Sequence, residues 1–135
     1  MAYWLLKSEP SVYSWEQFVN DGKTHWNGVR NHQAANNMKA MKKGDQAFFY
    51  HSNEGKEIVG IAEITKTAYP DHTDETGKFC MVDLKPVKPL KRFVTLAEMK
   101  AHPDLQSMAL IRQSRLSVTP VSDKEWALIT NLSKI

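Results

Sequence analysis

Short apolar runs separated by polar turns recur along the chain, and this pattern predicts a sheet of separate strands. Runs of roughly four to eight apolar or alternating residues bounded by turn residues are typical of strands. Five segments have this character: 3–7, 46–52, 57–69, 78–87 and 115–121. The second and third are separated by "NEG", which predicts a hairpin. Pro120 in the last segment predicts a sheet edge or a strand end, because proline cannot donate to a strand ladder.

Apolar residues at helical spacing predict four helices between these strands. Ser14 with Gln17 fits a capping box, after which Trp15, Phe18 and Val19 fall on one face and Gly22 ends the helix. Residues 33–43 repeat apolar positions at helical spacing and end at Gly44. Thr95 with Glu98 predicts a short helix before Pro103, and Ser122 with Glu125 predicts a last helix with Trp126, Ile129 and Leu132 facing inward.

Strands and helices of this kind do not follow one another in a regular βαβ order. We therefore predict an α+β fold, with a curved mixed sheet or partly closed barrel and short peripheral helices. The length of 135 residues fits a single domain over 1–135. No linker, repeat or low-complexity segment divides it.

Composition narrows the class of protein. Hydrophobic residues make up 41% and charged residues 24%, as in soluble globular proteins, and no apolar run is long enough to span a membrane. The N-terminus lacks the pattern of a signal peptide. A single Cys and five scattered His form no disulfide or metal pattern. We therefore expect a cytoplasmic protein with no metal and no cofactor, and a monomer or weak dimer.

The net charge of +3 is unevenly spread. Residues 23–56 carry six basic and two acidic side chains, 57–84 carry two and six, and 85–115 carry seven and two. If the two basic segments meet in space, they form a positive face suited to a polyanion such as nucleic acid. Ordinary solvated charge is the alternative.

Motifs for catalysis are missing from the sequence: it has no nucleophile elbow, zinc-protease helix, phosphate loop or dinucleotide motif. Cys80 sits in an apolar strand pattern and is expected to be a small buried side chain. His51 and Ser52 end a strand together, but no acid occupies a position that would orient the imidazole. We predict no catalytic residues.

The segment "THWNGVRNHQAANNMKAM" at 24–41 combines an indole with many amides. Trp26 before the Asn27–Gly28 turn can present one face to a base, and stacking on an aromatic ring is worth roughly 1–3 kcal/mol per base. Asn31 and Gln33 offer donors and acceptors for the edge of a ring, and Arg30 offers a charged planar group. The alternatives are a Trp packed in the core and amides that cap helices and turns.

Two further polar segments are candidates for the same site. Ser8 and Glu9 follow the first strand directly, and a carboxylate there can accept hydrogen bonds from an exocyclic amine. "RQSRLS" at 112–117 places Arg112, Ser114, Arg115 and Ser117 together like a phosphate clamp. The alternatives are that Glu9 pairs with a nearby cation and that Arg115 is a buried structural ion pair.

Taken together, the motifs resemble the EVE domain family of the PUA-like superfamily. The matching segments are "YWLLKSEP" at 3–10, "WNGVRNHQAANNMKAMKKGD" at 26–45, "FFYHSN" at 48–53, "VGIAEITKTAYPD" at 59–71 and "RQSRLSVTPVSDKEW" at 112–126. The chain is also similar to the thymocyte nuclear protein group, without the long basic extension of such nuclear members, so we expect a stand-alone bacterial member.

The resemblance implies a PUA-like fold and a cleft akin to that of YTH domains, and a non-catalytic module that reads a modified base, foremost modified cytosine in DNA. The base-binding candidates that it implies are Ser8, Glu9, Trp26, Gly28, Val29, Arg30, Asn31, Gln33, Tyr50, His51 and Ser52. The phosphate-binding candidates are Arg112, Ser114, Arg115 and Ser117. An RNA-binding module and a small-metabolite binder or enzyme remain the alternatives. The family commonly has Tyr in place of His32, Arg in place of Ala35, and often a Trp near Phe79 and Cys80.

Overall fold

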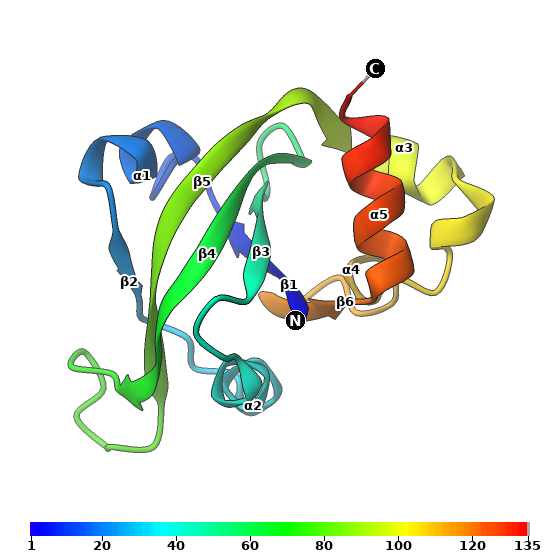
Figure 1. Cartoon of the computed structure of the whole chain (residues 1–135). Helices are drawn as coiled ribbons and strands as arrows, with labels where there is room; N and C mark the ends of the chain where they lie inside the picture. Colours follow the sequence, from blue (N-terminus) through cyan, green and yellow to red (C-terminus); the bar gives the residue numbers. More distant parts are fainter. Residues whose placement is uncertain (135) are drawn as a thin grey trace.

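Within residues 1–134, which the computed structural model describes, six strands form one mixed sheet in the order β2-β5-β4-β3-β1-β6 (Figure 1). The strands are β1 (Tyr3–Ser8), β2 (Thr24–Trp26), β3 (Gln46–His51), β4 (Glu57–Pro70), β5 (Cys80–Thr95) and β6 (Val118–Val121). β1 and β3 run parallel and all other neighbours are antiparallel. β2 and β6 are the two edges, so the sheet is open, and Pro120 lies on an edge strand as predicted.

Strands β4 and β5 form a long curved arm joined by residues 71–79 (Figure 1). Their register shifts at four places, including between Ile64 and Lys66 and between Lys66 and Tyr69. Such irregularities increase local twist and bend the strands. The bend explains how a sheet of six strands curves around one side of the molecule.

The helices are short and their ends follow local capping rules. They are α1 (Trp15–Asp21), α2 (His32–Ala40), α3 (Leu96–Ala101), the 3-10 helix η1 (Pro103–Leu105), α4 (Ala109–Arg112) and α5 (Asp123–Leu132). Three helices begin with a side chain that accepts a hydrogen bond from the backbone N–H three residues later. These side chains belong to Ser14, Thr95 and Ser122, which confirms the three predicted N-caps. Gly22 ends α1 with φ of 76°, a conformation that favours glycine.

Two hydrophobic cores lie on opposite faces of the sheet, because successive strand residues point to opposite sides. On β3, Ala47 and Phe49 face a core shared with α1, β2 and α2, whereas Phe48 and Tyr50 face a core shared with α3, α4 and α5. Figure 1 shows the same division, with α3, α4 and α5 gathered on one side of the sheet.

Two contacts set the local geometry of the first core. The backbone of Gly60 approaches the ring of Trp15 so closely that a Cβ built on Gly60 would lie 2.5 Å from Cη2 of Trp15. The buried carboxylate of Asp45 accepts hydrogen bonds from Nε1 of Trp4 at 3.1 Å, from the N–H of Lys42 at 3.0 Å and from the N–H of Ala2 at 3.2 Å. These bonds tie the start of β3 to β1.

Several sequence predictions need correction. Val19 is 47% exposed and does not share the buried face of Trp15 and Phe18. The second helix begins at His32 and ends at Ala40, short of Gly44. The strand predicted over 78–87 continues to Thr95, and the segment 115–121 is a strand only from Val118. Strand β2 and helix α4 were not predicted, because each is too short to show a period.

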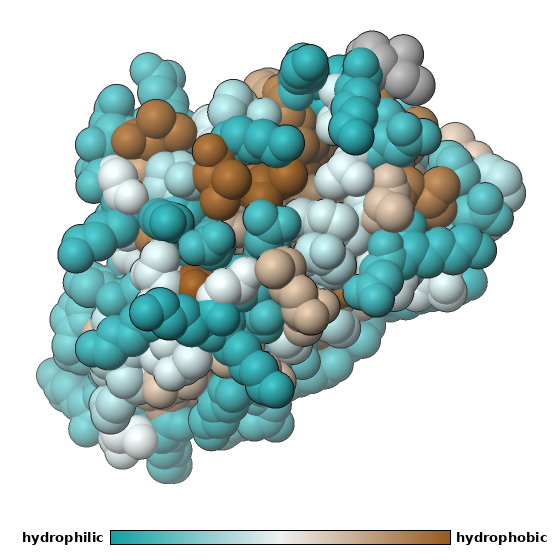
Figure 2. Space-filling view, in the orientation of Figure 1, coloured by the Kyte–Doolittle hydropathy of each residue, from teal (hydrophilic) through white to brown (hydrophobic). Residues whose placement is uncertain are grey.

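Hydrophilic residues cover most of the face seen in Figure 2, and hydrophobic residues form smaller areas on it. Within residues 1–134 no helix combines the length and the apolar composition that crossing a membrane requires.

Candidate functional site

A cleft of about 680 Å³ opens where β1 and β2 end and the loop 27–31 begins. Its size lies within the range of roughly 300–1,000 Å³ that ligand pockets usually have. The structure brings to it eight of the residues that the sequence singled out: Ser8, Glu9, Trp26, Gly28, Val29, Arg30, Asn31 and Ser117. The cleft therefore joins the first, second and last of the polar segments, which are far apart in the sequence.

One wall is the turn that follows β1. The hydroxyl of Ser8 donates to the carbonyl oxygen of Tyr13 at 2.6 Å, and the carbonyl oxygen of Glu9 accepts from the N–H groups of Val12 and Tyr13, both at 2.9 Å. These bonds fix the turn around Pro10. The side chain of Glu9 is exposed and has no hydrogen bond or ion pair with any residue of 1–134. Its carboxylate is thus available to a ligand, and the predicted alternative of a Glu9 ion pair is wrong.

Trp26 forms the back of the cleft rather than a free platform. It ends β2 opposite Val82, is only 9% exposed, and packs edge-on against Tyr13 and Phe49 at ring centroid distances of 6.4 and 5.7 Å. The prediction of an indole with one open face is therefore wrong. Its Nε1–H makes no hydrogen bond within residues 1–134, yet the only buried side-chain polar atom without a partner there is Oγ1 of Thr119. The indole nitrogen is therefore not fully buried.

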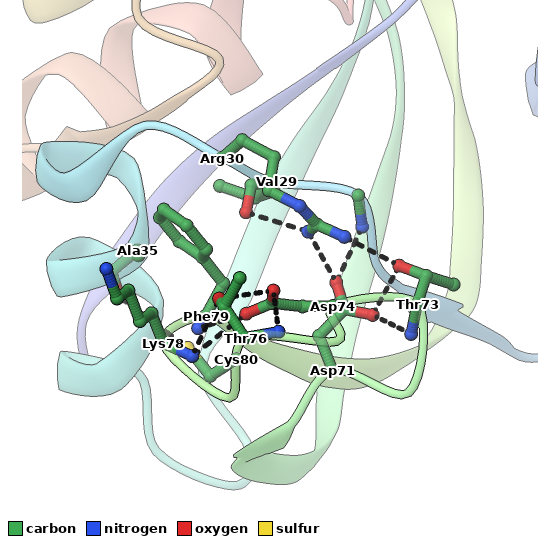
Figure 3. Close-up of polar contacts among 11 residues, drawn as sticks. Val29, Arg30, Ala35, Asp71, Thr73, Asp74, Thr76, Lys78, Phe79 and Cys80 are labelled. Atoms are coloured by element: carbon green, nitrogen blue, oxygen red, sulfur yellow. Dashed lines mark hydrogen bonds and ion pairs between the residues drawn. The ribbon is translucent and has the colours of Figure 1, made fainter.

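The loop 27–31 is held from below by Asp71, whose side chain is fully buried (Figure 3). Asp71 accepts hydrogen bonds from the N–H of Gly28 at 2.8 Å, from Nη1 of Arg30 at 3.0 Å, and from both the N–H and the hydroxyl of Thr73, at 2.7 and 2.6 Å. Burial alone would raise the pKa of Asp71. The bonds from Thr73, Gly28 and Arg30 outweigh it and hold that pKa well below its ordinary value.

Asn31 and the late segment complete the cleft. Asn31 caps α2, and its Oδ1 accepts from the N–H of Ala34 at 3.0 Å, which confirms capping and leaves its amide NH₂ as a donor. Ser117 also lines the cleft, just before β6, and its carbonyl oxygen accepts from the N–H of Lys7 at 3.0 Å. Nζ of Lys7 donates to the carbonyl oxygen of Ser114 at 2.7 Å, and burial lowers the pKa of this lysine.

The two arginines of the late segment, Arg112 and Arg115, are exposed and have no hydrogen bond or ion pair of their side chains with residues 1–134. Ser114 is exposed as well. The predicted alternative, a buried salt-bridged Arg115, is wrong. Neither arginine lines the cleft itself.

The model of the EVE domain family matches residues 2–132. The chain belongs to the EVE domain family. Thymocyte nuclear protein 1 of Rattus norvegicus is 39% identical, over 98% of this chain and 74% of the relative, and that of Homo sapiens is 36% identical with the same coverage. A solved structure of a Rhodopseudomonas palustris protein is 60% identical with a TM-score of 0.94, covering 99% of this chain and 94% of that one.

Two further solved structures carry ligands. Human THYN1 in complex with 5-methylcytosine-containing DNA is 35% identical with a TM-score of 0.90, covering 100% of this chain and 99% of that one. The YTH domain of Zygosaccharomyces rouxii MRB1, in complex with N6-methyladenosine RNA, is 16% identical with a TM-score of 0.63, covering 99% and 87%. The latter likeness shows the fold alone, and with the EVE match it supports the predicted PUA-like α+β architecture.

Four of the predicted base-binding residues of this EVE domain lie outside the cleft, as do Arg112, Ser114 and Arg115. Tyr50 is buried in the core on the other face of the sheet, and burial, with the charge of Glu57, raises its pKa to about 12. Nε2 of His51 accepts from the N–H of Trp15 at 3.0 Å, and the N–H of Ser52 donates to the carbonyl oxygen of Ser8. Gln33 donates to Gln113 at 2.7 Å. Ser52 thus bonds the backbone of a residue that lines the cleft, whereas His51 and Gln33 bond residues outside it.

Seven residues line the cleft that the sequence did not single out: Lys7, Val12, Tyr13, Thr24, His25, Asn27 and His72. Thr24, His25 and Asn27 belong to the segment 24–41, so the sequence pointed to their region without naming them as site residues. His25 is held at the rim, with its Nδ1 2.7 Å from Oδ1 of Asp83 and 3.0 Å from the hydroxyl of Tyr69. No local pattern marks His72, which comes from the loop between β4 and β5.

The positions expected to depart from the family pattern lie around Phe79 and Cys80. The ring of His32 packs on Phe79 at 5.0 Å, and the guanidinium of Arg30 lies 5.6 Å from the same ring. Ala35 is buried, and its carbonyl oxygen faces Sγ of Cys80 at 3.8 Å. Cys80 is buried as predicted, and burial raises the pKa of its thiol.

Proposed function

We propose that this protein binds nucleic acid and reads a modified base, foremost a modified cytosine in DNA, by holding it in the cleft without chemical conversion. The observation that carries the proposal is a cleft of base-holding size in which the carboxylate of Glu9 has no partner among residues 1–134. The relative human THYN1 is known in complex with 5-methylcytosine-containing DNA. An extruded base suits such a cleft because enzymes and readers reach modified bases outside the stack.

Polar groups around the cleft are complementary to cytosine. Glu9 supplies an acceptor for an exocyclic amine, and glutamate accepts from N4 of cytosine in known complexes. The amide NH₂ of Asn31 supplies a donor for a ring acceptor. The ring of Tyr13, half-buried and edge-on to Trp26, supplies an apolar surface. The walls thus offer hydrogen bonds in the plane of a base and aromatic contact outside it.

The negative charge of Glu9 disfavours a phosphate inside the cleft, so we place the backbone of the nucleic acid outside it. Arg112 and Arg115 are exposed, unpaired with residues 1–134, and belong to the segment that reaches the cleft at Ser117. Exposed cations of this kind hold phosphates without reading sequence. Extruding a base costs a few kcal/mol. We therefore expect a micromolar dissociation constant, which corresponds to a binding free energy of about −8 kcal/mol.

Titration of labelled duplexes tests the proposal. The duplexes differ at one position only, which carries cytosine, 5-methylcytosine or 5-hydroxymethylcytosine, and RNA of the same sequence is added as competitor. We expect tighter binding to at least one modified duplex. Equal or absent binding to all DNA duplexes would rule out the reading of modified cytosine. Stronger binding to RNA that depends on 2′-hydroxyls would favour the alternative of an RNA module.

A matched pair of variants assigns the binding to the cleft. Glu9→Gln removes the carboxylate from the cleft, whereas Glu16→Gln removes an exposed carboxylate from α1, outside the cleft. We expect the first variant to reduce the preference for the modified duplex and the second to preserve it. If both behave like the unaltered protein, Glu9 does not contact the base.

A further inference from the structure

Arg30 lies in the wall of the cleft, and its side chain is 40% exposed (Figure 3). Its Nη1 donates to the carbonyl oxygen of Val29 at 3.2 Å and to Asp71 at 3.0 Å, and its Nη2 donates to the hydroxyl of Thr73 at 3.0 Å. A guanidinium has five N–H groups in one plane. The two that make no bond within residues 1–134 are on Nε and Nη2, which are neighbours on one edge of the group.

Asp71 fixes the position of that edge. Its carboxylate is fully buried and its pKa is held low, so it stays charged and pairs with Arg30 at neutral pH. Moving the guanidinium away would leave a buried charge with one fewer donor, which is unfavourable. Phe79 lies against the guanidinium at 5.6 Å and restricts it further. Arg30 is therefore a fixed group whose charge is already balanced.

Arg112 and Arg115 differ from Arg30 in both position and charge, since they are neither fixed nor paired with a carboxylate of residues 1–134. They are exposed, and their side chains have no partner within residues 1–134, so they can follow a phosphate. A cation that neutralises a phosphate releases counterions and makes binding depend on salt. A cation already paired with a buried carboxylate contributes little to that dependence, since the pair as a whole is neutral.

We propose that Arg30 determines specificity in the cleft: its fixed Nε–H and Nη2–H edge donates to two adjacent acceptor atoms on the bound base, such as O2 and N3 of cytosine, and does not bind phosphate. The inference rests on the proposed function and deepens it. Asp71 acts through Arg30 and is a positioning residue. Arg112 and Arg115 supply the attraction for the backbone.

A neutral replacement of the pair separates these roles. Arg30→Gln combined with Asp71→Asn removes one positive and one negative charge and leaves the net charge at +3. The affinity for duplexes that carry 5-methylcytosine, cytosine or thymine at one position is measured over a series of salt concentrations. We expect the affinity for the 5-methylcytosine duplex to fall on the order of tenfold to a hundredfold and the salt slope to stay unchanged. We also expect its preference over the thymine duplex to be lost, because N3 is an acceptor in cytosine and carries a hydrogen in thymine.

Arg115→Gln is the contrasting variant. We expect it to lower the slope of log affinity against log salt by about 0.9 on duplex DNA and to keep the preference for 5-methylcytosine over thymine. Lys124→Gln, on α5 and outside the cleft, controls for the loss of one charge and should change neither quantity. The inference would be overturned if the double variant lowered the salt slope by about as much as Arg115→Gln does and kept its preference between the duplexes.

Arg30→Lys guards against a double variant that does not fold, because lysine keeps the charge opposite Asp71 but has no planar edge. We expect this variant to melt close to the unaltered protein and still to lose the preference. Affinity and preference equal to those of the unaltered protein would refute the assignment of Arg30. If the unaltered protein itself binds the modified and unmodified duplexes equally, the proposed function fails, and this inference fails with it.

Discussion

Trp26 belongs both to the core and to the cleft, and replacing it tests how the two are connected. The indole is 9% exposed and packs against Tyr13 and Phe49. A buried aromatic side chain removes about 150–250 Å² from water, which at about 25 cal/mol per Å² corresponds to about 4–6 kcal/mol. The surrounding side chains partly fill the cavity that the indole leaves, which reduces the loss of stability. Trp→Ala changes in cores therefore cost about 3–5 kcal/mol. We expect Trp26→Ala to lose about that much.

Urea unfolding followed by fluorescence or circular dichroism measures the loss. For a domain of this size, each kcal/mol corresponds to a fall of about 3–5 °C in melting temperature, so the midpoint should fall by about 10–20 °C. A free energy of unfolding reduced by less than about 1 kcal/mol would contradict the packing described for Trp26. It would instead indicate a mobile indole that can act as a free stacking surface.

Trp26→Phe separates stability from binding. Phenylalanine keeps an aromatic ring between Tyr13 and Phe49 and should cost about 1 kcal/mol, since it buries roughly 50 Å² less. It removes the indole N–H, which makes no hydrogen bond within residues 1–134 and is not fully buried. We expect a nearly native melting temperature together with weaker binding of the modified duplex. Native affinity in this variant would show that the N–H makes no contact with the base.

Three other predictions concern the supports of the fold. Gly60→Ala places a methyl group against the ring of Trp15 and should destabilise the protein by about 1–3 kcal/mol in urea unfolding; an unchanged midpoint would contradict the close approach. Asp45→Ala leaves the indole N–H of Trp4 without its acceptor and should cost about 1–3 kcal/mol by thermal melting, whereas an unchanged melting temperature would contradict this role. Burial lowers the pKa of His51, so stability is fully present above the pKa of the unfolded chain, about 6.5, and is lost as pH falls through it. His51→Gln should flatten this fall between pH 7.5 and 5.5, and an equally steep fall would show that another group titrates.

Local rules predicted the parts of the fold that depend on neighbours in sequence. Ser14, Thr95 and Ser122 were recognised as N-caps because a cap and its partner are three residues apart. The hairpin between β3 and β4 was recognised because its turn joins two apolar runs. A family motif that lies within one short segment likewise pointed to Ser8 and Glu9, which line the cleft.

Contacts between distant segments were not predictable in this way. β2 has three residues and exists because it pairs with Val82–Leu84 of β5, so nothing in Thr24–Trp26 itself indicates a strand. Alternation in β3 shows that Tyr50 and Phe49 point to opposite faces, but which face carries the cleft depends on where the helices pack. Tyr50 was therefore assigned to the site although its ring lies in the opposite core.

Asp71 is the clearest example of a supporting position in the candidate site that only the structure reveals. In the sequence it is one acidic residue after a proline, 41 positions from Arg30. In the fold it joins the loop 27–31 to the loop between β4 and β5 through four hydrogen bonds, with its side chain excluded from water. Ser8 fixes the opposite wall through Tyr13, and Asn31 fixes the start of α2 in the same manner. Each wall is thus held by a side chain bonded to nearby backbone or to Arg30, and the ordering of these loops is complete before a ligand arrives. Since ordering loops on binding lowers affinity, a cleft fixed in advance can hold a single extruded base despite the small area that one base offers.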